Sequence, residues 1–263
     1  MTELWYLIIG NPVLNGLIAL SSILFSNFGL AIIALTIIVR LILWPLTKRQ
    51  LNSTKAMQGM QPKLQELQKK YAKNKEKLQQ ETMKLYKEAG INPLGCIWPM
   101  LLQFPVWIAL YQSIIKALAT TPENLLSLSH HLYSWEVVAQ AFPLNSHFLW
   151  LDLGGHGDLI LAIIVGGTMW VQQKMTTAPS PDPRQQATNS MMQMMMPLMF
   201  GLFVLMFPSG LALFWAVSNA IGIGIQYFIT GGWGYLRPKA STQLVPVKGS
   251  KTASQKRSKL DQR

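Results

Sequence analysis

Residues 28–46 read FGLAIIALTIIVRLILWPL, a stretch of nineteen residues whose only formal charge is Arg40. Its length and apolar composition are typical of a helix that crosses a lipid bilayer. If the cytoplasmic boundary lies at Lys48 and Arg49, the guanidinium of Arg40 lies about 12 Å deep at a helical rise of about 1.5 Å per residue. A charge at that depth is costly, and it is too deep to snorkel easily to the lipid headgroups. The stretch therefore predicts a span with a polar or water-filled pocket around Arg40.

The composition of the whole chain agrees with this class. Half of the 263 residues are apolar, 13% are charged, and the mean hydropathy is +0.24. Several further runs approach the length of a membrane span, so we expect an all-α, polytopic membrane protein. The single cysteine, Cys96, can form no internal disulfide and has no His or Cys neighbours of the kind that hold a metal. We interpret it as a core residue and expect neither a metal nor a cofactor.

The distribution of positive charge predicts the topology. Lys and Arg gather in residues 47–89 and 237–263, whereas residues 118–158 contain none. By the positive-inside rule the first two regions are cytoplasmic and the third is external. The N-terminus is then outside and the C-terminus is cytoplasmic, with an irregular cytoplasmic loop at 174–184. The predicted spans are 28–47, 94–117, 158–176, 190–207 and 210–230.

Residues 1–27 are expected to form an external, interfacial segment. Two apolar runs, Leu4 to Ile9 and Val13 to Phe25, are separated by Gly10-Asn11-Pro12. Ser26 and Asn27 leave little room for a turn before the Arg40 span. A helix lying in the membrane interface therefore fits the pattern better than a sixth crossing.

Residues 48–91 predict a cytoplasmic helical hairpin. Apolar side chains recur at helical spacing in two groups on either side of a polar break at residues 73–75. The lysines that give the arm its charge are Lys63, Lys69, Lys70, Lys73 and Lys77. Two interpretations stay open: a solvated face that only keeps the loop soluble, or a docking arm for an acidic partner, lipid headgroups or an emerging polypeptide.

Polar side chains recur inside four of the five predicted spans. They are Thr36 and Arg40, Gln103 beside Trp107, Thr168 and Gln172, and then Trp215, Asn219, Gly222 and Gln226 on one face of the last span. Any one pair is explained by ordinary hydrogen bonding between helices. Taken together, the stripes favour one wet cavity around Arg40, because polar groups at that depth should face protein or water.

The fourth predicted span is different, because it is rich in methionine. Seven of the fourteen methionines lie between Met191 and Met206. Thioether side chains are flexible and adapt to varied apolar partners. This face is interpreted either as a lipid contact or as a sliding surface for transient partner helices.

Several motifs, in order along residues 28–235, resemble the YidC family of membrane protein insertases. They include Val39-Arg40, Trp44 to Lys48, Met60 to Lys63, Asn92 to Gly95, Gln172 to Met175, Met196-Pro197, Phe207 to Leu211 and Ser218-Asn219. The resemblance implies a five-helix core around a hydrophilic groove that opens to the cytoplasm and to lipid and is closed outside. Arg40 matches the groove arginine, and Pro45 is expected to kink the first span. Phe214-Trp215 replaces a pair of tyrosines found in many members.

The function that this resemblance implies is assisted insertion and folding of newly made membrane proteins in the bacterial cell (inner) membrane. No enzymatic step is expected, and the chain resembles the short form that lacks a large external domain. Nascent membrane proteins and membrane lipid are the implied partners, with the general secretion channel and the ribosome as further candidates. The ribosome would contact the hairpin and the basic, disordered cytoplasmic tail, residues 236–263, through Lys251, Lys256, Arg257 and Lys259. The alternative for the tail is that it only reinforces the topology by attraction to anionic lipid. A small-solute transporter with an intramembrane arginine site is the alternative.

Overall fold

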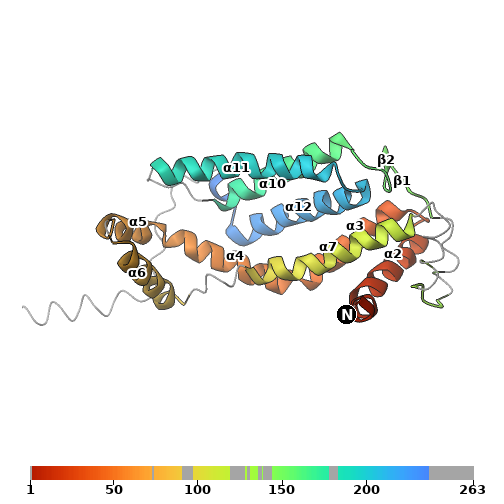
Figure 1. Cartoon of the computed structure of the whole chain (residues 1–263), viewed down its shortest axis with the longest axis horizontal. Helices are drawn as coiled ribbons and strands as arrows, with labels where there is room; N and C mark the ends of the chain where they lie inside the picture. The colour runs from red at the N-terminus through yellow and green to blue at the C-terminus, as the bar shows by residue number, and fades with distance from the viewer. Residues whose placement is uncertain are drawn as a thin grey trace, which may run out of the picture.

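The computed structural model shows an all-α chain, which confirms the predicted fold class. Long helices run side by side, with two short helices, α5 and α6, at one end and a small hairpin of β1 and β2 at the other (Figure 1). The structure describes residues 2–72, 74–90, 97–118, 128, 131–135, 138, 144–177 and 183–236.

The first predicted span is bent. Helix α3, Phe28–Ile42, begins with the Asn27 side chain accepting a hydrogen bond from the Leu30 backbone N–H, and α4, Trp44–Gly59, follows after one residue. The two helices meet at 63°, and Pro45 occupies one of the first two positions of α4. Proline has no N–H to donate there, which allows the helix to bend at this point. The span 28–47 is therefore not one straight helix.

Four further helices complete the bundle. They are α7, Ile97–Ala117; α10, Leu159–Thr176; α11, Pro183–Val204; and α12, Ser209–Thr230. Helix α12 is central, since it packs against α3, α10, α4 and α7, whereas α11 packs mainly on α10. The core contains fully buried side chains from several helices, among them Ile32, Leu110 and Leu211.

The bounds of α11 correct the prediction. The helix begins at Pro183 and not at residue 190, because proline is well tolerated at the first position of a helix, where its missing N–H has no partner to lose. It ends at Val204, three residues before the predicted end. Both ends of the predicted irregular loop 174–184 are therefore helical, since α10 continues to Thr176 and α11 begins at Pro183. Residues 178–182 lie outside the described residues.

Two described helices are long and apolar enough to cross a membrane, Tyr6–Ile23 and Ser209–Thr230, or three if the bent α3 and α4 pair is one span. Helices α7, α10 and α11 are 21, 18 and 22 residues long. All three carry glutamines, which lower their mean hydropathy. The count of five spans therefore stays a prediction.

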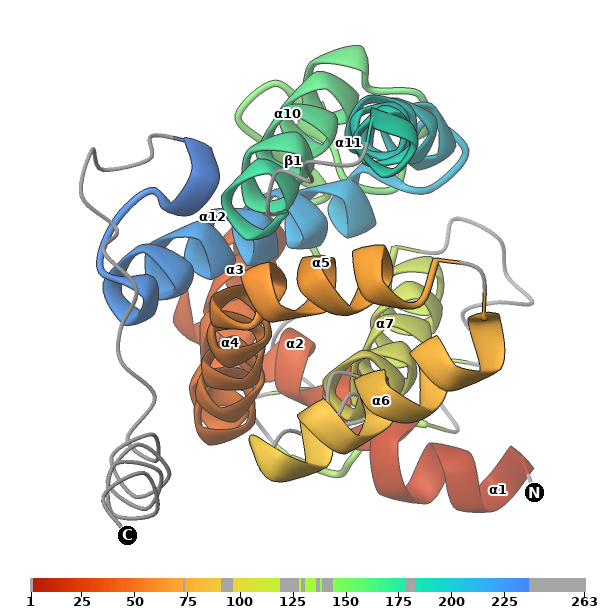
Figure 2. The same ribbon diagram turned by 90° about the vertical axis from the view of Figure 1, so that its left-hand side faces the viewer.

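The N-terminal segment is one continuous helical stretch, contrary to the predicted split at Gly10-Asn11-Pro12. Helix α1, Thr2–Trp5, passes into a π-helical turn η1, Tyr6–Gly10, and then into α2, Asn11–Ile23. Pro12 lies in the first positions of α2, where a proline does not break the helix. Figures 1 and 2 show this segment inclined to the long axis of the bundle.

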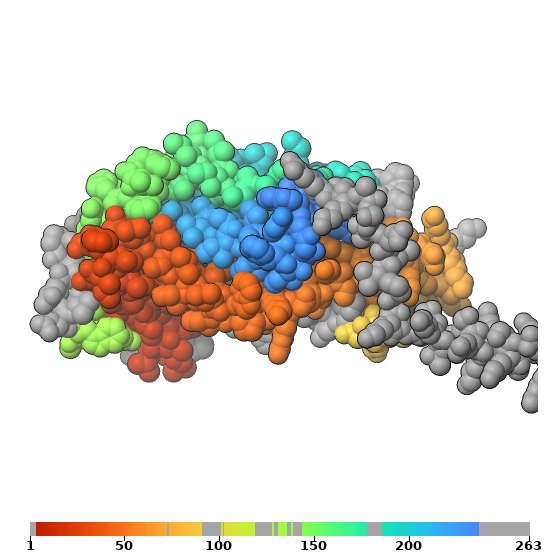
Figure 3. Space-filling model, turned by 180° about the vertical axis from the view of Figure 1, so that it is seen from behind, coloured from red at the N-terminus to blue at the C-terminus, as the bar shows by residue number. Residues whose placement is uncertain are grey.

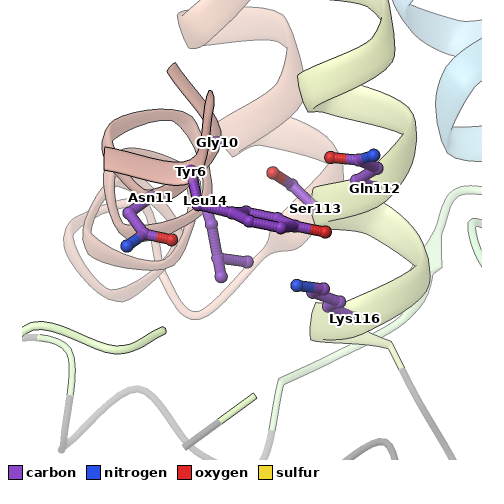
Figure 4. A pocket seen from close by; sticks show the side chains of 7 residues that line it. All are labelled: Tyr6, Gly10, Asn11, Leu14, Gln112, Ser113 and Lys116. Carbon is purple, nitrogen blue, oxygen red and sulfur yellow. The ribbon is translucent and has the colours of Figure 1, made fainter. Parts of the chain in front are cut away.

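The N-terminal helix is attached to α7 by polar contacts. The Trp5 indole N–H donates to the Gln112 side chain at 3.0 Å, and the Lys116 ammonium lies 4.1 Å from the centre of the Tyr6 ring (Figure 4). The second contact is a cation–π interaction. Whether the segment lies in the interface or forms a sixth span stays a prediction.

The charged arm that follows the first predicted span has three helices where two were predicted. Residues 48–59 belong to α4, which continues out of the bundle, and the hairpin proper is α5, Gln61–Lys70, and α6, Lys75–Glu88. Asn74 caps α6 by accepting from the Lys77 backbone N–H. Figure 2 shows α5 and α6 at the end of the bundle that faces the viewer.

The opposite end is closed by a small hairpin between the starts of α3 and α12. Strand β1, His147–Phe148, pairs antiparallel with β2, Leu151–Asp152. Leu153, which follows β2, is fully buried and accepts from the Gly210 backbone N–H at 2.9 Å. After α12 a short 3-10 helix η3, Gly234–Leu236, packs back on α10.

Candidate functional site: the polar junction around Arg40

Arg40 on α3 is held by a hydroxyl group of α12. Its Nε and Nη2 donate hydrogen bonds of 3.0 and 2.6 Å to the Ser218 Oγ, and Ser218 is only 4% exposed. The one ion pair in the part of the chain that the structure describes is Glu81 with Lys84. Arg40 therefore has a neutral acceptor and no carboxylate within that part, so its positive charge is not compensated there.

Helix α10 brings Gln172 to the same place. The Gln172 Nε2 donates to the Asn219 carbonyl oxygen at 3.4 Å. The Asn219 Nδ2 lies 3.2 Å from the Thr168 Oγ1 and 3.5 Å from the Val165 carbonyl oxygen. The polar faces predicted for the third and last spans thus contact each other.

Gly222 leaves the space in which α3, α10 and α12 meet. A Cβ at Gly222 would collide with the Gln172 side-chain amide and would lie 3.8 Å from the Arg40 Nη2. Only a residue without a side chain fits here while Gln172 keeps its position. We call Arg40, Gln172, Ser218, Asn219 and Gly222 the polar junction.

The remaining predicted polar residues lie elsewhere or bond differently. Thr36 is fully buried and donates to the Ile32 carbonyl oxygen of its own helix at 2.6 Å. The half-buried Gln103 makes no side-chain hydrogen bond within the described residues. Gln226 lies further along α12, where its Nε2 donates to the Thr176 Oγ1 at 2.8 Å. Gln58 of α4 donates to the Thr176 carbonyl oxygen at 2.5 Å, so Thr176 joins three helices.

Trp107 and Trp215 belong to an aromatic cluster and not to the polar junction. Their rings stack with centroids 5.9 Å apart, and Phe207 lies against both, at 5.8 and 5.7 Å. Phe200 of α11 packs edge-on against Trp215 at 5.1 Å. Apart from Thr36 and Gln103, the predicted groove residues are therefore divided between the polar contacts of α3, α10 and α12, an aromatic cluster of α7, α11 and α12, and a contact at Thr176.

Sequence reasoning missed Ser218 and Thr176 as site residues, although both carry a hydroxyl group within a predicted span. Ser218 directly precedes the predicted Asn219, and adjacent residues point about 100° apart on a helix. The rotation of α12 relative to α3 decides which of the two meets Arg40, and no sequence pattern reports that rotation.

The methionine-rich helix α11 has an open apolar face. Met191, Met194 and Met199 are 62%, 73% and 63% exposed. On its other side α11 approaches α10 closely, since a Cβ at Gly201 would lie 3.1 Å from the Ala162 carbonyl oxygen. Close backbone approach at glycine is typical of helix pairs in membranes.

The lysines of the hairpin that the structure describes, Lys63, Lys69, Lys70 and Lys77, are solvent-exposed. The Lys70 and Lys77 ammonium groups lie 5.5 and 5.6 Å from the centre of the Tyr71 ring, at the turn between α5 and α6. The hydrogen bond from Lys84 lowers the pKa of the Glu81 carboxyl below its ordinary value. Lys63 and Lys69 lie on α5. Lys73 and the tail residues Lys251, Lys256, Arg257 and Lys259 lie outside the described residues.

Comparison with known proteins identifies the family. The family model described as 60Kd inner membrane protein matches residues 19–233. A membrane protein insertase YidC of Histophilus somni (strain 129Pt) is 39% identical over 230 residues, which are 87% of this chain and 38% of that protein. The YidC of Pasteurella multocida (strain Pm70) is 40% identical over the same lengths, and that of Haemophilus influenzae (strain PittEE) is 41% identical over 209 residues, 79% of this chain and 34% of that protein.

The matched region contains every residue of the polar junction and of the aromatic cluster. The chain spans a little over a third of the length of these relatives. More than two thirds of the residues lie inside the family model, and the identities to the YidC relatives are near 40%. The chain therefore belongs to the 60Kd inner membrane protein family, which is the YidC family.

Proposed function

We propose that this chain is a membrane protein insertase, which assists the insertion and folding of newly made membrane proteins without an enzymatic step. The names of its relatives support this proposal and do not support the solute-transporter alternative. The observation that carries it in the structure is an arginine within an apolar helix whose guanidinium has, among the residues that the structure describes, only a neutral hydroxyl as its side-chain partner.

The physical task of an insertase is to lower a desolvation barrier. A polar or acidic flank of a new protein loses its hydration when it enters the hydrocarbon region, at a cost of several kcal/mol for each charged group. The polar junction offers donors and acceptors at that depth, and the uncompensated charge of Arg40 attracts acidic flanks. Water that hydrates the junction completes the hydrophilic groove that we propose there.

The hydrophobic segment of the client takes a different route. It is proposed to leave sideways along the aromatic cluster and the open face of α11, where Met194 and Met199 are largely exposed. Partitioning of the apolar segment into lipid then drives the step, because apolar surface is removed from water. Neither a nucleotide nor a metal is part of this scheme.

The proposed setting is the bacterial inner membrane, with the N-terminus outside and the hairpin and tail in the cytoplasm. The basic hairpin is proposed to recruit clients, since its lysines are accessible for contact with an acidic partner. The ribosome and the general secretion channel are proposed partners at this side, and membrane lipid surrounds the bundle.

Site-specific photo-crosslinking to a nascent membrane protein on stalled ribosomes tests the proposal. A photoreactive residue at Asn219 or Trp215 should capture the client. The same residue at Ile163, which is 66% exposed on α10 and lies about 180° around that helix from Gln172 at about 100° per residue, serves as the lipid-facing control. Equal capture from all three positions would contradict a defined client path.

A further inference from the structure

Three residues other than glycine have a positive φ among those that the structure describes: Phe25 at 58°, Ser26 at 53° and Leu149 at 55°. All three lie in turns at the end of the bundle where α3 and α12 begin. A left-handed backbone is rare for Phe and Leu, so the surrounding structure must hold these turns in place. Residues in such backbone conformations are concentrated at functional sites.

Leu149 and Trp150 form the two-residue loop of the β1–β2 hairpin. The favoured loops of this length place Gly, Asn or Asp at positions with positive φ, and not an aliphatic residue. The ends of the loop are fixed by the pairs His147 with Asp152 and Phe148 with Leu151. As a result, Leu149 is 76% exposed and Trp150 is 55% exposed. The fold thus presents two large apolar side chains at the tip of a polar-flanked hairpin.

The turn between α2 and α3 likewise exposes a large apolar side chain, Phe25, which is 91% exposed. A β-bridge between Asn27 and Asn145 ties this turn to the chain that leads into the hairpin. Figure 3 shows the red-to-orange atoms of the end of α2 next to the green atoms of the hairpin region, at one end of the molecule. We call Phe25, Leu149 and Trp150 the apolar turns.

Further exposed apolar side chains lie at the ends of the adjoining helices α2 and α10. Ile23 at the end of α2 is 70% exposed, and Leu159 and Ile160 at the start of α10 are 62% and 54% exposed. In a membrane protein, side chains of this kind at a helix end face the lipid near the bilayer boundary.

The chemistry of the apolar turns favours contact with the membrane interface. Trp and other amphipathic aromatic residues concentrate at the level of the lipid headgroups. Residues 118–158 contain no Lys or Arg, so attraction to anionic headgroups is not the driving force. Transfer of the apolar side chains out of water is sufficient.

We propose that Phe25, Leu149 and Trp150 insert into the interfacial region of the outer leaflet and anchor this end of the bundle at a fixed depth. The polar residues His147 and Asp152 at the base of the hairpin stay in water. The inference goes beyond the proposed insertase function. It rests on the proposed function only for the assignment to the outer leaflet, because the proposed topology decides which leaflet the turns contact.

Fluorescent labelling of the full chain in lipid nanodiscs, without a client, tests the anchor. Cys96 is replaced by Ala, and an environment-sensitive NBD probe is attached to a single Cys at Leu149, Phe25 or His147, the last being the matched control. We expect probes at Leu149 and Phe25 to emit at shorter wavelength, to be quenched by lipids that carry a nitroxide near the headgroup, and to be protected from iodide. The probe at His147 should show the reverse. Iodide access at Leu149 and Phe25 equal to that at His147 would overturn the proposal.

A second variant separates the anchor from the overall fold. Leu149→Asn keeps a residue that tolerates positive φ, so the hairpin should form while its apolar tip is lost. A probe at position 150 should then lose its lipid quenching, whereas unchanged quenching would show that Leu149 anchors nothing. Because no client is present, failure of this test leaves the insertase proposal untouched, and failure of client insertion would not alter the labelling pattern.

Discussion

Arg40 on α3 and Ser218 on α12 are joined by two hydrogen bonds, both donated by the guanidinium to one hydroxyl oxygen, at 3.0 and 2.6 Å. A hydrogen bond to a charged group contributes about 1.5–3 kcal/mol. The bonds therefore hold the side chain in position, while the neutral acceptor leaves its charge uncompensated. A carboxylate in the place of Ser218 would hold the guanidinium equally well and cancel that charge.

The first prediction concerns this serine. Ser218→Ala removes the acceptor and should lower the insertion of a client with an acidic flank, because Arg40 is no longer held at the junction. Ser218→Thr keeps a hydroxyl group and should restore most of the activity. Insertion into vesicles at equal protein levels measures the effect. Wild-type activity in the Ala variant would show that Ser218 does not position Arg40.

The second prediction concerns the space at Gly222. Gly222→Ala places a methyl group where the Gln172 amide lies, so the amide must move or the helices must separate. Overpacking of this kind costs about 1–3 kcal/mol. We expect lower thermal stability in detergent and lower insertion activity. Gly224→Ala is the matched control on the same helix, since nothing lies within 4 Å of its added Cβ. Equal effects of the two substitutions would contradict the close packing of the polar junction.

The contact between α10 and α11 gives the third prediction. Gly201→Ala would bring a Cβ within 3.1 Å of the Ala162 carbonyl oxygen, whereas Gly167→Ala on α10 meets nothing within 4 Å. The Gly201 variant should unfold at lower temperature, and the Gly167 variant should match wild type. A thermal unfolding assay in detergent compares them. If the Gly201 variant is as stable as wild type, α11 is not held by close backbone approach.

The proposed orientation gives the fourth prediction. In a chain without Cys96, a cysteine at the exposed Asn145 should react with an impermeant reagent added to intact cells, whereas one at the exposed Asn74 should be protected until the membrane is opened. Labelling of both positions in intact cells would rule out the predicted topology.

The sequence alone was sufficient to predict the fold class, and it singled out Arg40 as a candidate site residue. A single charge within nineteen otherwise uncharged residues is a strong signal, because a charge in lipid is costly wherever the helix packs. The starts of α10 and α12 also agree with the prediction to within one residue, since Asp158 caps α10 and Pro208 precedes α12.

The features that the sequence did not predict depend on prolines placed in the first turn of a helix and on the rotation of each helix about its axis. The continuation of α4 to Gly59 and the passage of the N-terminal helix through Pro12 both use a proline in the first turn of a helix, where it does no harm. The polar stripes were expected to converge on one cavity, but Trp215 turns toward α7 and α11 while Asn219 turns toward α10. Which neighbour each face meets is decided by tertiary packing.

The proposed attraction between the positive charge of Arg40 and the acidic flanks of clients is tested most directly by insertion of a matched pair of clients. The pair differs only in whether Asp and Glu in the translocated flank are present or neutralised, and each client is assayed in vesicles with wild type, Arg40→Lys and Arg40→Ala at equal protein levels. We predict that Arg40→Ala impairs the acidic client far more than the neutral one, and that Arg40→Lys keeps part of the activity because the ammonium remains charged. Equal loss for both clients, in both variants, would contradict the electrostatic role and leave Arg40 as a residue that only ties α3 to α12.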